Sequence, residues 1–384
     1  MKSKLIPLAV IFCFARLASA QTHLAFPGAE GFGQFASGGE GGEIVHVTTL
    51  ADSGPGSFRD AVSKPNRVVV FDVSGIIALK SNVAVSSDVS LLGQTAPGDG
   101  VVLYGRSVSF SGQKNIIVRY LRFREGIAGD KGKCSVNISK GANMIFDHCS
   151  IQWGRWDCLG LTQGSRDITF QHCIIGEGVD PQRFGSLTDS ATNVTYTHNL
   201  WINNQSRNPK AKGRIQYVNN VVYNWGVCGL VGGHSGADHF LDTVGNYFIA
   251  GPNSGSHAVG QFSATDHVFQ QANVVDGDKD GKLNGRELLP ADFGAGKDAP
   301  TFTKEFTVAP LTNVTVESAE SALAGVLAHA GCSLRRDAVD ARLIDAVKSF
   351  GTRGKIIHAE AEAGGIGEWK EVHAPADLKA MAAP

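Results

Sequence analysis

Similar segments recur along the middle of this chain at intervals of 21 to 28 residues. Each unit contains one or two stretches of alternating apolar residues bounded by Gly, Asn, Asp or Ser, and no helical pattern lies between the units. A repeat of this length built only of short strands is typical of a parallel β-solenoid. One coil cannot bury its apolar side alone, so the coils must stack at the strand spacing of about 4.8 Å. The units begin at Asn115, Asn143, Asp167, Asn193, Arg214, Phe240 and His267.

The repeat predicts ladders of equivalent side chains along the solenoid. The seventh position of the unit becomes Asn in four successive copies, and the position before it carries aromatic or imidazole rings in four copies. An Asn ladder lets each amide bond to its neighbour, and Asn also tolerates the left-handed backbone of a bend. The predicted Asn ladder is Asn199, Asn220, Asn246 and Asn273, and the ring ladder is Tyr120, His148, His172 and His198.

The composition agrees with an all-β fold of many short strands. Gly accounts for 47 of the 384 residues, and charged residues for only 18%. A disordered chain would be more charged or poorer in Val, Ile, Leu and Phe, and a coiled coil would be rich in Glu, Lys and Leu. The glycines instead indicate repeated tight turns at the coil corners.

Residues 1–20 are predicted to be a secretory signal peptide, with early lysines, an apolar run over 5–14 and a small-residue cleavage site at 18–20. Its removal takes three basic residues and changes the formal net charge from −1 to −4. This mildly acidic charge argues against a nucleic-acid partner. The remaining sequence has no 18-residue apolar stretch, so we expect a secreted, extracellular monomer that does not span a membrane.

The predicted solenoid covers residues 21–300, and residues 301–384 are predicted to form a C-terminal extension. Within this extension, 319–330 and 337–350 have the apolar spacing of helices. Helices here would cover an edge or side of the solenoid that could otherwise pair with another chain.

Six cysteines remain after residue 20, and two pairs of them are 24 residues apart. Stacked Cα atoms about 4.8 Å apart fall within the disulfide range of roughly 4.4–6.8 Å. We therefore predict the disulfides Cys134–Cys158 and Cys149–Cys173, with buried free thiols as the alternative. Cys228 and Cys332 could be paired or free. Four sequons, which are weak signals, mark candidate glycosylation sites at Asn137, Asn193, Asn204 and Asn313.

Residues 276–287 fit the twelve-position calcium loop, with the required glycine at the sixth position. No helical pattern flanks this segment, so we predict a structural calcium ion that pins an excursion from the solenoid; an Asp/Gly-rich turn without an ion is the alternative. The predicted ligands are Asp276, Asp278, Asp280, Asn284 and Glu287.

Several longer motifs follow one another in a fixed order between about residues 25 and 370. They are the segments 26–33, 41–47, 52–61, 147–150, 206–209, 219–225 and 336–340. In order and spacing they resemble the secreted pectate lyases of polysaccharide lyase family 1. The resemblance implies a right-handed parallel β-helix and calcium-assisted β-elimination of pectate, an acidic plant cell-wall polysaccharide.

The resemblance also implies site residues. The family's base is an arginine, which matches Arg207; from the residues alone, Arg207 would be interpreted as a substrate clamp, because arginine is normally not deprotonated in proteins. Lys212, Lys210 and Arg183 are the predicted substrate-binding cations, and a solvated surface lysine is the alternative for Lys212.

Relatives place calcium-binding carboxylates on adjacent coils beside the arginine, and the candidates here are Asp157, Asp130, Glu177 and Asp180. Asp157 matches best, although Cys158 stands where relatives carry a second acid. A solvated turn carboxylate is the alternative for each candidate. Asp147 and His148 are interpreted as structural members of the ladders.

Two other functions fit the same sequence. One is a lyase on another uronate polysaccharide, and the other is a carbohydrate-binding solenoid without catalysis, which the missing acid at Cys158 favours. A hydrolase is disfavoured because no pair of motif-borne carboxylates offers acid and base roles.

Overall fold

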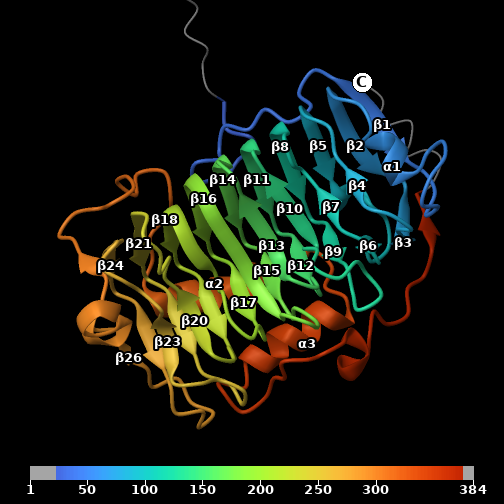
Figure 1. Ribbon diagram of the computed structural model, residues 1–384. Coiled ribbons are helices and arrows are strands. Elements are labelled where there is room, and N and C mark those ends of the chain that lie inside the picture. Colours follow the sequence, from blue (N-terminus) through green and yellow to red (C-terminus); the bar gives the residue numbers. More distant parts are fainter. Residues whose placement is uncertain (1–22, 375–384) are drawn as a thin grey trace, which may run out of the picture.

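The structure, a computed structural model, describes residues 23–374, so the predicted signal peptide lies outside the described residues. It is an all-β parallel β-helix of about nine turns, as predicted (Figure 1). Successive coils contribute strands to two long sheets of 17 and 11 strands. Nearly all neighbouring strands are parallel, so each coil adds its strands to the edge that the previous coil leaves open.

The first sheet contains β1 (Glu43–Val47), β2 (Arg67–Phe71), β4 (Val83–Ala84), β5 (Val89–Leu92), β7 (Val108–Ser109), β8 (Lys114–Arg119), β10 (Val136–Ser139), β11 (Ala142–Asp147), β13 (Asp157–Thr162), β14 (Arg166–Gln171), β16 (Phe184–Thr197), β18 (Lys210–Val218), β20 (Cys228–Val231), β21 (His239–Val244), β23 (His257–Gly260), β24 (Asp266–Gln271) and β27 (Thr301–Phe302). The second contains β3 (Val73–Ala78), β6 (Val101–Tyr104), β9 (Arg122–Arg124), β12 (Ser150–Gln152), β15 (Ile174–Gly176), β17 (Leu200–Ile202), β19 (Val221–Tyr223), β22 (Tyr247–Ile249), β25 (Val274–Asp276), β26 (Arg286–Glu287) and β28 (Val372–His373).

The helices are α1 (Phe58–Ala61), α2 (Ala319–His329) and α3 (Ala338–Val347), and the 3₁₀ turns are η1 (Gly93–Thr95), η2 (Pro290–Phe293), η3 (Gly296–Asp298) and η4 (Glu360–Ala363). The two predicted C-terminal helices are thus confirmed, with ends that differ from the prediction by at most three residues. Among the described residues, no helix is long and apolar enough to cross a membrane.

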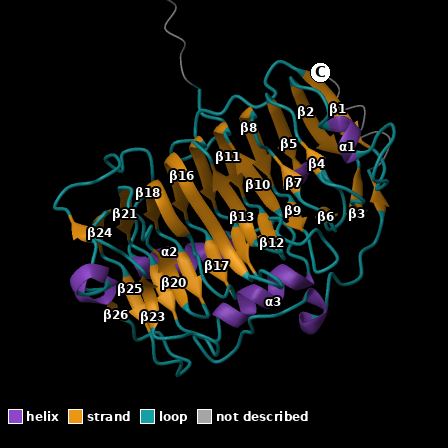
Figure 2. Ribbon diagram, viewed as in Figure 1, coloured by secondary structure: helices purple, strands orange, loops and turns teal. Residues whose placement is uncertain are grey.

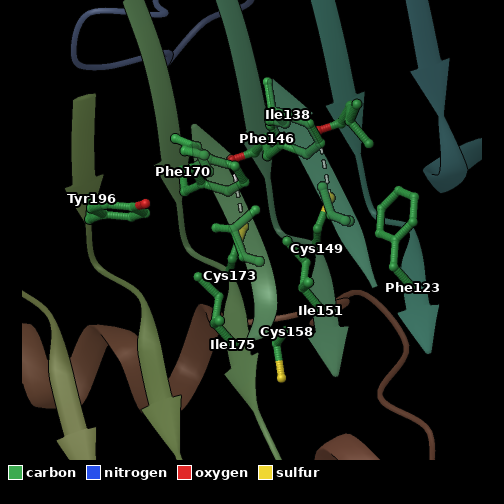
Figure 3. Close-up of a cluster of buried hydrophobic side chains, with 14 of the residues drawn as sticks. Phe123, Ile138, Phe146, Cys149, Ile151, Cys158, Phe170, Cys173, Ile175 and Tyr196 are labelled. Atoms are coloured by element: carbon green, nitrogen blue, oxygen red, sulfur yellow. Dashed lines mark hydrogen bonds between the residues drawn. The ribbon is translucent and has the colours of Figure 1, made fainter. Parts of the chain in front are cut away.

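The strand register confirms the repeat. One continuous ladder joins equivalent residues of seven coils: Ile116, Met144, Ile168, Val194, Ile215, Leu241 and Val268. The steps along this ladder equal the intervals between the sequence units. Apolar side chains at such positions point inward and stack on one another, as the ring of Phe170 does on Phe146 at 4.6 Å between centroids (Figure 3).

The predicted Asn ladder is also confirmed. The Nδ2 amide of Asn199 donates to Oδ1 of Asn220 at 3.0 Å, and the same bond joins Asn220 to Asn246 at 3.1 Å and Asn246 to Asn273 at 2.8 Å. Each accepting oxygen also takes the backbone N–H of the preceding ladder residue. The buried amides therefore satisfy one another along the axis.

The ring ladder stacks in the same way. The ring centroids of Tyr120 and His148 are 4.7 Å apart, those of His148 and His172 are 4.8 Å apart, and those of His172 and His198 are 5.2 Å apart. All four residues have a left-handed backbone, with φ between 50° and 54°, because they form a bend between the sheets.

The two predicted disulfides are wrong, because all six cysteines in the described part of the chain are free thiols. Cys149 and Cys173 do lie on adjacent coils (Figure 3), but side chains in a parallel ladder point the same way, and each thiol donates to a backbone carbonyl instead. For the other pair, β10 aligns Val136 with Leu159, a step of 23 residues. This register puts Cys134 level with Asp157 and not with Cys158.

The C-terminal extension packs along one long side of the solenoid, where Figure 2 shows α2 and α3 beside the sheets. Their apolar faces bury Leu323, Val326 and Leu343 against the second sheet. At the start of α3, Asp337 and Asp340 form a buried ion cluster with Arg124 of β9. The last strand of the described extension, β28, pairs antiparallel with β3 at the end of the second sheet opposite β26.

The ring ladder should make the fold sensitive to acid. Burial, and then the neighbouring His148 and His198, lower the pKa of His172 to about 3. In the unfolded chain His172 binds a proton near pH 6.5, whereas in the folded chain it stays neutral until about pH 3. The free energy of unfolding therefore decreases as the pH falls below 6.5. At about 1.4 kcal/mol per pH unit, the loss by pH 4 is at most about 3.5 kcal/mol.

We expect His172→Phe, which keeps a stacked ring but cannot be protonated, to reduce this loss. Urea unfolding at pH 7 and pH 4 measures it. His267→Phe is the control, since His267 also stacks on a ring, that of Phe240 at 5.0 Å, but lies outside the ring ladder and is 29% exposed. If His172→Phe and the wild type lose the same stability between the two pH values, the assignment is wrong.

Candidate active site

The predicted site residues gather at one edge of the β-helix, where successive coils pass from the second sheet to the first. Asp157 opens β13 after β12, Arg183 precedes β16 after β15, and Arg207 lies between β17 and β18. Because consecutive coils stack, residues that are 24 to 50 positions apart in the chain become neighbours at this edge.

Arg207 is held in a defined orientation. Its backbone has a left-handed φ of 63°, and its carbonyl accepts the N–H of Ser186 at 2.7 Å. The preceding coil can approach this closely because Gly185 has no side chain. A Cβ at this position would lie 2.4 Å from the carbonyl oxygen of Arg207 and would clash with it. The guanidinium carbon lies 4.2 Å from the ring centroid of Phe184, so one face of the cation rests on an aromatic surface.

Asp157 binds the same guanidinium from the side. Both carboxylate oxygens are 3.2 Å from Nη1 of Arg207, and the carboxylate side chain is 1% exposed. Burial raises the pKa of Asp157 to about 6, and Arg207 opposes this rise. This contact was not predicted, because the sequence suggested Asp157 as a metal ligand.

The two predicted substrate-binding lysines lie next to Arg207 on β18. Lys210 pairs in register with Leu187 and Lys212 with Asp189, whose carboxylate is 3.3 Å from Nζ of Lys212. Partial burial lowers the pKa of the Lys210 amine, and the nearby charges of Arg207 and Lys212 lower it further. Three cations therefore share one small region, which suits an anionic ligand.

Arg183 lies at the outer end of this region and contacts the C-terminal extension. Its Nε is 3.4 Å from Asp180, and its Nη1 is 3.4 Å from Nε2 of His358. His358 in turn holds Asp180 at 3.1 Å through Nδ1. Nothing in the sequence indicated that a residue 175 positions away would reach this place.

The four predicted calcium-binding acids at the site do not come together. Glu177 is buried in a two-pronged ion pair with Arg342 of α3, with both contacts at 2.7 Å. Asp130 faces Arg106 at 3.8 Å, and Asp180 is bound by His358. Over residues 23–374, no three His, Cys, Asp or Glu side chains cluster closely enough to hold a metal ion.

Sequence reasoning missed one buried carboxyl at this edge. Glu125, which follows β9, is 1% exposed, and burial raises its pKa to about 7. Its oxygens accept the backbone N–H groups of Asp130 at 3.2 Å and Arg155 at 3.4 Å. It therefore shapes the loop beside the site, and no motif in the sequence singled it out.

The predicted calcium loop lies at the end of the solenoid after β25. Gly281 at the sixth position has a φ of 83°, as such a loop requires. Three of its carboxylates accept backbone N–H groups within the loop. Asp278 accepts from Asp280, Asp280 from Lys282, and Asp276 from Asn284. Burial and the nearby charge of Asp278 raise the pKa of Asp276, because both disfavour the ionised carboxylate. A cation bound in the loop would favour the ionised form instead. Glu287 is exposed on β26, and the carboxylates of the described loop do not cluster closely enough to hold an ion without moving together.

One of the predicted glycosylation sites is inaccessible in the folded chain. Asn204 is fully buried, and its Nδ2 donates to the carbonyl of Ile175 and to Asn208. A glycan on that nitrogen would break both bonds. Asn137, Asn193 and Asn313 are half-buried.

The chain resembles curated fungal proteins along most of its length. It is 41% identical over 370 residues to the probable pectate lyase C of Aspergillus flavus, a match that covers 96% of this chain and 87% of that protein. The protein of the same name from Emericella nidulans is 42% identical over 374 residues, with 97% and 87% covered. No protein-family model matches the chain.

Solved structures share the fold at low sequence identity. The cedar pollen allergen jun a 1 has a TM-score of 0.58 at 19% identity and covers 79% of this chain and 92% of its own. The thermostable pectate lyase PL 47 has a TM-score of 0.58 at 15% identity, with 82% and 99% covered. At these identities the likeness supports the β-helix fold alone.

The ion pair of Glu177 suggests a test of its structural role. We expect Arg342→Ala to lower the free energy of unfolding by about 3 kcal/mol, since it leaves a buried carboxylate without its partner. Adding Glu177→Gln should restore part of this loss. Urea unfolding measures both, with Lys348→Ala as a control, because Lys348 belongs to an exposed pair with Asp345. Equal losses from the Arg342 and Lys348 variants would contradict the role.

Proposed function

Because this chain belongs to the pectate lyase family, we propose that it is a secreted enzyme that cleaves the uronate polymer pectate by β-elimination. The family makes it a polysaccharide lyase, and the names of the fungal relatives support pectate as the substrate. The observation that carries the proposal is the arrangement of Arg207, held by Phe184 and Asp157, beside Lys210 and Lys212.

The reaction explains why cations are needed. A base removes the proton from C5 of a uronate, the electron pair forms the C4–C5 double bond, and the glycosidic oxygen on C4 departs with its electrons. Negative charge develops on the carboxylate next to C5 in the transition state, and positive groups around it lower the barrier. Lys210 and Lys212 can supply this charge, and Arg183 can bind a further carboxylate of the polymer.

Arg207 is our candidate for the base. An arginine must lose a proton before it can accept one, which requires positive surroundings and little water. The lysines supply positive charge, and Phe184 shields one face of the guanidinium from water. Nε and Nη2 of Arg207 make no hydrogen bond among the described residues, and the side chain is 21% exposed, which supports contact with a substrate.

Calcium would serve this reaction by bridging protein and substrate carboxylates and withdrawing charge from the substrate. The four acids predicted for that role do not fit it, because three are held by Arg207, Arg342 and His358, and Asp130 stands apart from them. The proposed reaction at this edge therefore includes no step through a calcium ion.

The first test is the lyase activity itself. The purified chain should produce the unsaturated product from polygalacturonate, followed by its ultraviolet absorbance, and we expect Arg207→Lys to lower kcat by about 10²–10⁴-fold. Binding without product would instead support the non-catalytic solenoid, and product from a different uronate polymer only would change the substrate.

Arg214 offers a matched control for Arg207. It lies on β18 and rests on the ring of Phe240 at 4.3 Å, but its Nη2 donates to the carbonyl of Thr307 at 2.9 Å, away from the site. Arg214→Lys should retain activity within about threefold. An active Arg207→Lys variant, with a circular dichroism spectrum like that of the wild type, would remove Arg207 as the base.

We also propose that residues 276–287 bind a structural calcium ion through Asp276, Asp278, Asp280, Asn284 and Glu287. Calcium prefers six to eight oxygen ligands, and the fold of the loop around Gly281 supports this assignment. A bound ion at 100 times its Kd would stabilise the folded chain by about 2.7 kcal/mol.

Chelation should therefore lower the Tm by a few degrees in a thermal scan, and the double variant Asp278→Asn/Asp280→Asn should abolish this response. Asp238→Asn, an exposed aspartate outside the loop, serves as the control. If chelation leaves the Tm of the wild type unchanged, the loop is a turn without an ion.

A further inference from the structure

We propose that Asp157 is a positioning residue for Arg207 and not a calcium ligand, and that Lys210 and Lys212 neutralise the substrate carboxylate in place of a protein-bound calcium ion. This inference rests on the proposed lyase function. It changes the cofactor requirement of the reaction, since the site around Arg207 would then work without divalent metal.

The first observation is the geometry of the Asp157–Arg207 pair. Both oxygens of Asp157 lie at 3.2 Å from one nitrogen, Nη1, and Phe184 covers one face of the guanidinium at 4.2 Å. These two contacts fix both the position and the plane of the cation. A calcium ion on Asp157 would need those same oxygens at 2.3–2.6 Å and would place a divalent charge against Arg207.

The second observation is the shortage of other oxygen ligands around Asp157. Cys158, the next residue, turns its thiol inward, where it donates to the carbonyl of Gly176 at 3.2 Å. The oxygens of Glu125 accept two backbone N–H groups, that of Asp130 in its own loop and that of Arg155 on the next coil. A calcium site needs several oxygens, and Asp157 offers the only carboxylate on its coil that faces Arg207 in the described chain.

The third observation is that the site around Arg207 already contains the charge that calcium would bring. Lys210 and Lys212 are two residues apart on β18, so their side chains lie on the same face of the strand. Together they carry the charge of one divalent ion. Only Asp189 counters them directly, at 3.3 Å from Lys212, and Lys210 makes no ion pair among the described residues.

Steady-state kinetics of the full chain on polygalacturonate test the inference. The wild type, Asp157→Asn and Asp157→Glu are assayed in chelator and at rising calcium concentrations, at a temperature well below the Tm. We expect the wild type to keep at least a third of its kcat in chelator. Asp157→Asn should lose at least tenfold in kcat with KM changed less than threefold, and Asp157→Glu should recover part of that loss.

Variants of Lys210 and Lys212 test whether these lysines neutralise the substrate carboxylate. Lys210→Ala and Lys212→Ala should raise KM or lower kcat at least tenfold, and added calcium should not restore either value. The inference is overturned if chelator abolishes the wild-type activity, calcium restores it, and Asp157→Asn raises the calcium concentration for half-maximal activity tenfold or more.

A binding measurement separates this inference from the lyase assignment. Calorimetric titration of calcium into the Asp278→Asn/Asp280→Asn variant, with and without oligogalacturonate, should show no binding at the site around Arg207. Binding that disappears when Asp157→Asn is added would overturn the role of Asp157 even if no uronate polymer is cleaved. Absence of product from every uronate polymer, with no calcium binding, would overturn the lyase function and leave the ion pair as a structural contact.

Discussion

Parallel hydrogen bonding between equivalent positions of successive coils governs this structure. It fixes the distance between coils at about 4.8 Å and gives stacked side chains the same direction. Amides, imidazoles and phenyl rings gain from that arrangement, as the ladders at Asn220, His172 and Phe170 show. Cysteines do not gain from it, because a disulfide needs two side chains that turn toward each other. The free thiols of Cys149 and Cys173 are therefore a consequence of the same pairing that builds the core.

The C-terminal extension covers apolar and charged residues of the second sheet that the solenoid itself does not bury. Its helices cover the second sheet, and charged residues of β9 and α3 that would be costly to bury alone are paired with one another, as Arg124 is with Asp337 and Asp340. The extension also reaches the candidate active site, where Arg342 binds Glu177 and His358 binds Asp180. Glu177 and Asp180 are thereby paired with residues of the extension and are not free to bind a metal ion. The extension therefore both covers the solenoid and determines which acids at its edge are available.

The periodic part of the molecule could be predicted from the sequence, because a repeat states which residues will be neighbours. The ladders, the strand spacing and the two C-terminal helices all follow from local pattern. The register of Cys134 could not be predicted, since a single residue gained or lost in a loop shifts it from Cys158 to Asp157.

The contacts that define the site were equally hidden, because they join loops of different length. The motif around Arg207 located the arginine, and adjacent lysines followed from it. Its partner Asp157 lies 50 residues earlier, and His358 approaches Arg183 from 175 residues later. Glu125 had no pattern around it, and only its burial distinguishes it.

The scaffold also explains how a chain of nearly neutral net charge can bind a polyanion. Stacking places Arg183 and Arg207 on adjacent coils, about 4.8 Å apart in the direction of the axis, while β18 spaces alternate residues by about 6.8 Å across it. Four cations thus occupy a small area in a fixed array, although the chain as a whole carries a formal charge of −1. Since such a field falls off within roughly a Debye length of 8–10 Å, the local array matters more to a bound uronate than the net charge. Asp157 adds a buried carboxylate to this array, and its ion pair with Arg207 favours an orientation of the guanidinium beside its neighbours over one that turns toward water.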